Sequence, residues 1–254
     1  MDHNTHIYCY WSSITDQSAQ SDNGIIILTK IKSENTMYGV GDPNGDQQAR
    51  AITLEFNDCI ILFTCNQRNG VTEDNHLSQT TWEEQLAKHL TRSKRDAARA
   101  NKKFIWTGDL NVDPDNAEWI MEAPQKRAKT RTSPEACRSE DQVTYRDLIA
   151  RINGMNVAEH FNKVAGTTFR DENHLMTNKG QRLDLVIAER ALLEGKSTLQ
   201  ITAFDTMQKF GAGRQGSSDH CPLYSSLNGL SKNKSPKRPT THHPELGILS
   251  EWMC

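Results

Sequence analysis

The residues best suited to chemistry begin with the motif Gly108-Asp109-Leu110-Asn111, which follows the apolar run 104–107. This run lacks turn residues and predicts a buried strand, and Gly108 allows the backbone to change direction at its end. If the strand continues, Asp109 and Asn111 lie on one face, because side chains alternate along a strand. Their oxygen atoms suit a magnesium or manganese ion and a phosphate. The alternative is an ordinary turn after a strand, because Gly, Asp and Asn are common turn formers.

Two further motifs carry ionisable side chains later in the chain. Asp184 lies inside the apolar run 183–188, where a charge needs a partner or a function. A salt bridge to Arg182 or to another Arg is the structural alternative. Asp219 and His220 come directly before a last predicted strand, on a loop of the kind that often carries reactive groups. A lone His, however, more often makes a structural hydrogen bond than a catalytic one.

The elements that must position these motifs follow from apolar runs and capping patterns. Capping boxes that start at Thr81 and Ser139 predict two helices, with Leu86 and Leu90 on the apolar face of the first. Strands of mixed direction with helices between them indicate α/β layers around a sheet core. Loops are predicted at 37–48 and 67–77, and strands at 8–12 (an edge strand or a loop), 24–29 (a buried strand), 49–56 and 59–65 (a hairpin), 104–107, 167–169, 183–188, 199–204 and after Pro222.

The composition describes a nearly neutral chain of 254 residues with a net charge of −2. This length fits one large domain or two small ones, and the balanced charge means that any contact with DNA must come from local patches. No apolar run is long enough to cross a membrane, and the N-terminus has no signal-peptide pattern. The six cysteines are scattered without a Cys-x-x-Cys pair, which argues against zinc and indicates a reduced, intracellular protein. Nothing in the sequence indicates an oligomer.

The C-terminal segment differs from the rest of the chain. Residues 229–254 are rich in Ser, Lys, Pro and Thr and predict a disordered basic tail, because few apolar residues are available to offset the loss of chain entropy. The folded domain is therefore expected to span 1–228. Lysines in the tail are compatible with a contact to nucleic acid or a nuclear signal, so the nucleus is one alternative for the location. An inert tail is the other interpretation.

The order of the three motifs, Gly-Asp-x-Asn, Arg-x-Asp and Ser-Asp-His, resembles the endonuclease/exonuclease/phosphatase superfamily. More narrowly, it is similar to the exonuclease III-type apurinic/apyrimidinic endonucleases, from about Tyr8 to Leu227. The resemblance implies an α/β fold, a four-layered sandwich of two mixed β-sheets flanked by helices, with the site at the strand ends. It also implies a metal-dependent phosphodiester hydrolase that acts on DNA with Mg²⁺ or Mn²⁺.

The resemblance assigns a role to each motif residue. Asp109 would orient or deprotonate the attacking water, and Asn111 would help to bind phosphate and metal. His220 would contact the scissile phosphate, and Asp184 would accept a hydrogen bond from His220, fixing its tautomer and favouring its charged form. Asp219 would hold the metal together with the first two residues. All of these side chains are then expected to converge on one cleft.

The sequence also departs from the family pattern. The family begins with a strand that carries an Asn and a strand that ends in the principal metal-binding Glu, whereas no Glu precedes Glu34 here. We therefore expect an N-terminally incomplete domain with weak magnesium binding, little cleavage of abasic DNA and poor solubility. Cys65 stands where a Tyr is expected, and Phe169 precedes Arg170 rather than Trp. The alternatives are a catalytically inactive relative that serves as a binding module, a mobile-element nuclease, or another phosphoesterase of the superfamily.

Overall fold

The fold was analysed in a computed structural model of the whole chain. Asp219, Phe169, Arg170 and the predicted tail from residue 231 onward lie outside the residues that the structure describes, so their predicted roles stay predictions. Residues 73–80 and 139–143 are described by their backbone alone. The described residues are 7–13, 24–41, 49–66, 73–112, 139–163, 168, 182–206, 220 and 222–230.

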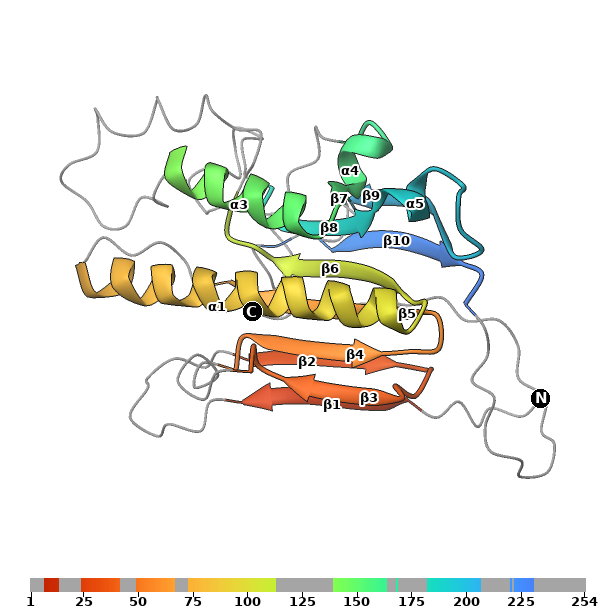
Figure 1. The fold of residues 1–254 in the computed structure, drawn as a ribbon, viewed down its shortest axis with the longest axis horizontal. Coiled ribbons are helices and arrows are strands. Elements are labelled where there is room, and N and C mark those ends of the chain that lie inside the picture. Colours follow the sequence, from red (N-terminus) through yellow and green to blue (C-terminus); the bar gives the residue numbers. More distant parts are fainter. Residues whose placement is uncertain are drawn as a thin grey trace, which may run out of the picture.

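A six-stranded mixed sheet forms the centre of the fold, as Figure 1 shows. Strands β5 and β6 are parallel, and the other neighbours are antiparallel. The predicted hairpin is confirmed as β4 and β5, and the strand predicted at 104–107 is confirmed as the middle of β6. In spatial order the strands are β3 (Asn35–Tyr38), β4 (Ala51–Glu55), β5 (Cys59–Cys65), β6 (Lys103–Asp109), β8 (Asp184–Glu189) and β7 (Gly154–Asn156).

Helices cover one face of this sheet. Helix α1 (Glu73–Arg99) and helix α3 (Ser139–Arg151) pack beside each other on that face (Figure 1). Leu86 and Leu90 are fully buried there, as predicted, against Leu62 of β5. The alternation of side chains along each strand therefore sends every second residue into this helix-covered core.

Two separate antiparallel pairs of strands cover the other face. The pair β1 (Tyr8–Ser13) and β2 (Gly24–Thr29) packs on β4 and β5. The pair β9 (Gln200–Thr206) and β10 (Leu223–Asn228) lies on the same face. It belongs to one apolar cluster with β2, α4 (Val157–His160) and α5 (Arg190–Leu193). The chain is thus a layered α/β protein, but within the described residues the second sheet layer consists of two pieces rather than one continuous mixed sheet.

Two predicted element boundaries and one predicted burial pattern differ from the structure. Helix α1 begins at Glu73 and not at Thr81, so the Thr81 pattern lies inside the helix. The predicted loop 37–48 starts with the end of β3. The segment 24–29 is a strand, but it is buried on only one face because Ile26 and Leu28 are exposed.

Of the described helices, none is long and apolar enough to cross a membrane.

Candidate active site

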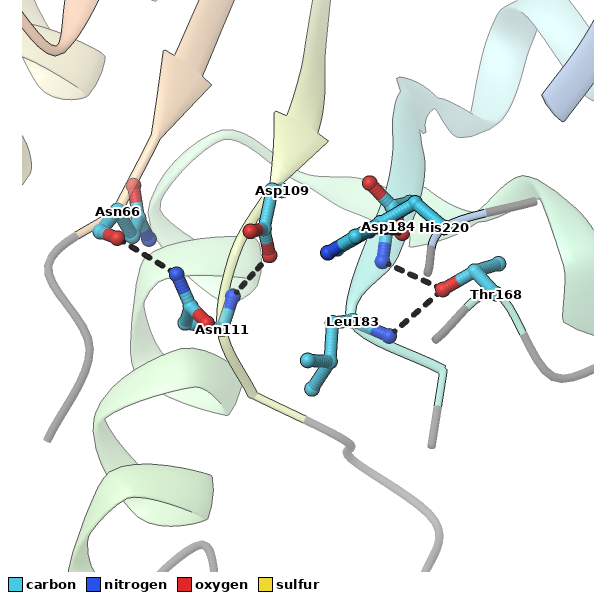
Figure 2. Close-up of polar contacts among 7 residues, drawn as sticks. All are labelled: Asn66, Asp109, Asn111, Thr168, Leu183, Asp184 and His220. Carbon is cyan, nitrogen blue, oxygen red and sulfur yellow. Dashed lines mark hydrogen bonds and ion pairs between the residues drawn. The ribbon is translucent and has the colours of Figure 1, made fainter. Parts of the chain in front are cut away.

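The motif residues meet where four chain segments reach the same end of the central sheet, at the ends of its inner strands. Asp109 ends β6 and lies directly opposite Asp184, which begins β8. On its other side, Asp109 is the partner of Cys65, which ends β5. His220 comes to the same place from the segment before β10 (Figure 2). The structure therefore brings Asp109, Asn111, Asp184 and His220 together at one end of the sheet, whereas the predicted neighbour Asp219 lies outside the described residues.

Gly108 has a backbone conformation and a close backbone neighbour that exclude a residue with a Cβ atom at this position. Its φ is 142°, and a Cβ atom on this residue would lie 1.8 Å from the carbonyl oxygen of Thr64 in the neighbouring strand. The glycine thus allows β5 and β6 to stay paired through Gly108 and on to Asp109. The close approach of the Gly108 and Thr64 backbones brings Asp109 to the end of the sheet.

Asp109 and Asn111 are held together by a turn and not by a continuing strand. The strand ends at Asp109, and Asn111 has a φ of 52°. The backbone N–H of Asn111 donates to Oδ1 of Asp109 at 2.9 Å. The strand does not continue, so the condition under which both side chains would share one strand face is not met. The turn that the sequence left as the alternative forms instead, because Asx-type hydrogen bonding bends the chain. The turn still keeps both side chains at the site.

Asn66 is a site residue that sequence reasoning missed. Its backbone N–H donates to the carbonyl oxygen of Asp109 at 2.8 Å, and its own carbonyl oxygen accepts from Nδ2 of Asn111 at 2.7 Å (Figure 2). Because Nδ2 is used in this way, Oδ1 of Asn111 points away from Asn66. Cys65, which was matched to the family position, instead packs against the apolar cluster. The missed signal was a polar residue directly after an apolar strand, the same context that drew attention to Asp109.

Asp184 and His220 form a charge-assisted pair. His220 Nδ1 and Asp184 Oδ2 are 2.8 Å apart, and their side chains are 20% and 4% exposed. An ionised carboxylate can only accept, so Nδ1 carries the proton in this bond. The predicted contact is confirmed. In Figure 2 the His220 ring extends from Asp184 toward Asp109.

The electrostatics of the site argue for a function. Two carboxylates directly opposite each other on antiparallel strands repel, and both Asp109 and Asp184 are buried. His220 compensates Asp184, and the Asn111 N–H compensates part of Asp109. A site that concentrates buried negative charge in this way favours a cation or a positively charged His beside it.

The donor set fits a hard divalent cation in its chemistry. Asp109 supplies a carboxylate and Asn111 an amide oxygen, the kinds of ligand that Mg²⁺ prefers. The Oδ1 atom of Asn66, beside the same turn, is buried and has no hydrogen-bond partner among the described residues. Across the described ranges, however, no group of three or more His, Cys, Asp or Glu residues is arranged to hold a metal. The predicted third ligand, Asp219, is outside those ranges.

Comparisons with known proteins point to one group. No protein-family model matches the chain. The DNA-(apurinic or apyrimidinic site) endonuclease of Dictyostelium discoideum is 25% identical over 222 residues, or 85% of this chain and 55% of that protein. The DNA repair nuclease APEX1 of Danio rerio is 25% identical over 219 residues, or 84% of this chain and 63% of that protein. A solved 3'-5' exonuclease from Neisseria meningitidis has a TM-score of 0.63 at 18% identity and covers 87% of this chain and 79% of that chain.

The chain spans about half the length of the curated relatives it matches. The structural match establishes the layered α/β fold. The roles of the individual site residues stay predictions that rest on the geometry above.

Proposed function

We propose that this chain, which has the fold of the exonuclease III-type endonucleases of the endonuclease/exonuclease/phosphatase superfamily and is related to them in sequence, hydrolyses phosphodiester bonds in DNA. The observation that carries the proposal is the Asp184–His220 pair, held at 2.8 Å beside the carboxylate of Asp109. The names of the relatives support DNA, and abasic sites within it, as the substrate.

His220 is proposed to bind the scissile phosphate. Donation from Nδ1 to Asp184 fixes the tautomer, and the adjacent carboxylate favours the imidazolium form. In that form Nε2 also carries a proton and can donate to a phosphate oxygen, where negative charge builds up in the transition state. Asp184 thereby acts through His220 and does not need to touch the substrate.

Asp109 is proposed to orient the attacking water and to accept its proton. One of its oxygens is held by the N–H of Asn111, so the direction of the carboxylate is set before the substrate arrives. Attack by the water forms a new P–O bond, the bond to the leaving oxygen breaks, and the leaving oxygen takes up a proton.

A divalent ion, Mg²⁺ or Mn²⁺, would neutralise charge on the phosphate oxygens when bound. Asp109 and Asn111 would hold it, and Asp219 is the proposed third ligand. With so few carboxylates, we expect weak binding, because magnesium gives up its water reluctantly. The chain is therefore expected to need a high magnesium concentration and to turn over slowly.

The test is cleavage of a duplex oligonucleotide that contains one abasic site, measured across a magnesium titration. We expect slow cleavage that requires magnesium and that falls at least about 100-fold in His220→Ala, the usual size of a lost proton-transfer or charge contact. His160→Ala, which removes an exposed His at the end of α4, is the matched control and should cleave as the unchanged chain does. Cleavage that survives His220→Ala would contradict the proposal.

A binding module without activity is the second candidate. Fluorescence anisotropy with the same oligonucleotide distinguishes the two functions. Specific binding without cleavage at any magnesium concentration would support the module and overturn the hydrolase.

A further inference from the structure

Thr168 lies against the point where the chain enters β8. Its side chain is fully buried. Its hydroxyl oxygen accepts from two consecutive backbone N–H groups, those of Leu183 and Asp184, each at 2.9 Å (Figure 2). A single side-chain atom from a segment 15 and 16 residues earlier in the chain thus holds both residues.

These two N–H groups need such an acceptor. Within the described residues, β7 pairs with β8 only at Ile187, Ala188 and Glu189, so the first half of β8 has no strand beside it on that edge. Buried N–H groups without partners are costly, because they lose their hydrogen bonds to water. Two successive N–H groups that converge on one oxygen also fix the path by which the chain enters the strand.

The same two hydrogen bonds set the position of the Asp184 carboxylate. Asp184 is the first residue of β8, so its Cα position depends on the N–H bonds that begin the strand. Its carboxylate must then lie within hydrogen-bond reach of His220, a residue 36 positions later in the chain. A small shift of the Asp184 backbone would lengthen this bond, and with it would release the orientation of the imidazole ring.

We propose that Thr168 is a positioning residue for the site: its hydroxyl aligns the Asp184 backbone so that the carboxylate holds His220 in one tautomer. Thr168 does not contact the reacting atoms. Its effect on cleavage rests on the proposed hydrolase function, whereas its effect on the His220 ring does not.

The first measurement is a long-range ¹H–¹⁵N spectrum of the His220 imidazole without substrate or metal, at one fixed alkaline pH at which the ring is neutral and therefore has a tautomer. In the unchanged chain we expect a protonated Nδ1 with a distinct ¹⁵N shift. Thr168→Val keeps the shape of the side chain but removes the acceptor, and should give averaged shifts of two tautomers. Thr168→Ser keeps the hydroxyl and should preserve the spectrum of the unchanged chain.

The second measurement is cleavage of the abasic duplex by the same variants. We expect kcat to fall roughly 10–100-fold in Thr168→Val with KM nearly unchanged, as for other groups that orient a site His through its partner. Thr53→Val is the matched control, because Thr53 is a buried Thr whose hydroxyl bonds to His89, away from the site. It should change neither the His220 spectrum nor kcat.

The outcomes separate cleanly. If Thr168→Val leaves the His220 spectrum unchanged, or if Thr168→Ser disturbs it as strongly, the positioning role is overturned. If Thr168→Val does not fold, Thr168→Ala against Thr168→Ser provides the same comparison of a lost and a retained hydroxyl. If the unchanged chain does not cleave DNA, the proposed function fails, while the spectrum still decides the role of Thr168.

Discussion

The two faces of the central sheet are covered in different ways. On one face, α1 and α3 form a layer over fully buried side chains such as Leu86, Leu90 and Trp106. On the other face, two separate strand pairs share the cover, and the outer side of the β1–β2 pair is apolar and exposed. Trp11 is 66% exposed and lies opposite Ile26, which is 45% exposed.

The difference shows which part of the molecule supports the site. Asp109 and Asp184 belong to the central strands that the helices cover, so their positions depend on the helix-covered core. A two-stranded sheet has little stability of its own, and β1–β2 depends on the face beneath it. We therefore expect β1–β2 to be able to detach while the site remains in place.

The largest effect should come from a cavity in the helix-covered core. Leu90→Ala removes a fully buried side chain of α1, and should lower the free energy of unfolding by about 3–4 kcal/mol. Ile27→Ala, at a buried position of β2, should cost about half as much or less, because the strand pair can move to fill the space. Urea unfolding followed by circular dichroism measures both. Equal losses would mean that both faces unfold as one unit.

An intermediate effect should come from pH acting on His89, which joins α1 to β4. Its Nε2 lies 2.9 Å from the Thr53 hydroxyl and its Nδ1 3.1 Å from the Arg92 guanidinium. Burial, and then the charge of Arg92, lower the pKa of His89 from 6.5 to about 4. As the pH falls, the unfolded chain therefore takes up this proton first, near its ordinary pKa, and the folded state loses stability between pH 6.5 and 4.

The loss should reach on the order of 3 kcal/mol at the acid end of that window, since one pKa unit corresponds to about 1.4 kcal/mol. His89→Gln cannot take up the proton, so its unfolding free energy should depend less on pH across this range. Urea unfolding at a series of pH values compares the two chains. Identical pH slopes would show that His89 does not link the helix layer to the sheet in this way.

The smallest effect on stability should come from the exposed side of β1–β2. Replacing both Trp11 and Ile26 by Thr should change the unfolding free energy by no more than about 0.5 kcal/mol, because exposed side chains contribute little. Self-association should fall, because exposed apolar patches promote it. Light scattering during size-exclusion chromatography measures this, with Lys196→Thr, an exposed residue elsewhere, as the control. A large loss of stability would show that this face is covered within the folded protein.

Local patterns predicted much of the central sheet. The hairpin of β4 and β5 follows from an alternating pattern before the turn at Asn57 and Asp58 and an apolar run after it, and β6 follows from the apolar run before Gly108. The start of α1 was missed, because the polar residues before Thr81 carry no apolar stripe. The exposed face of β2 was missed as well. A run of Ile and Leu predicts a buried strand whether or not other layers cover both of its faces.

The sequence by itself determined the candidate residues Asp109, Asn111, Asp184 and His220, because their side-chain chemistry can be read locally and their motifs follow the order of a known superfamily. It placed Asp184 inside a strand, whereas the structure places it at the first residue of β8. Only the tertiary structure decided that Asp109 lies opposite Asp184, that Asn66 contacts Asn111 and that Thr168 holds the start of β8. The physical reason is that strand register and hydrogen bonds between distant segments depend on how the whole chain packs. No pattern within a short stretch of residues specifies which buried N–H group a distant hydroxyl will satisfy.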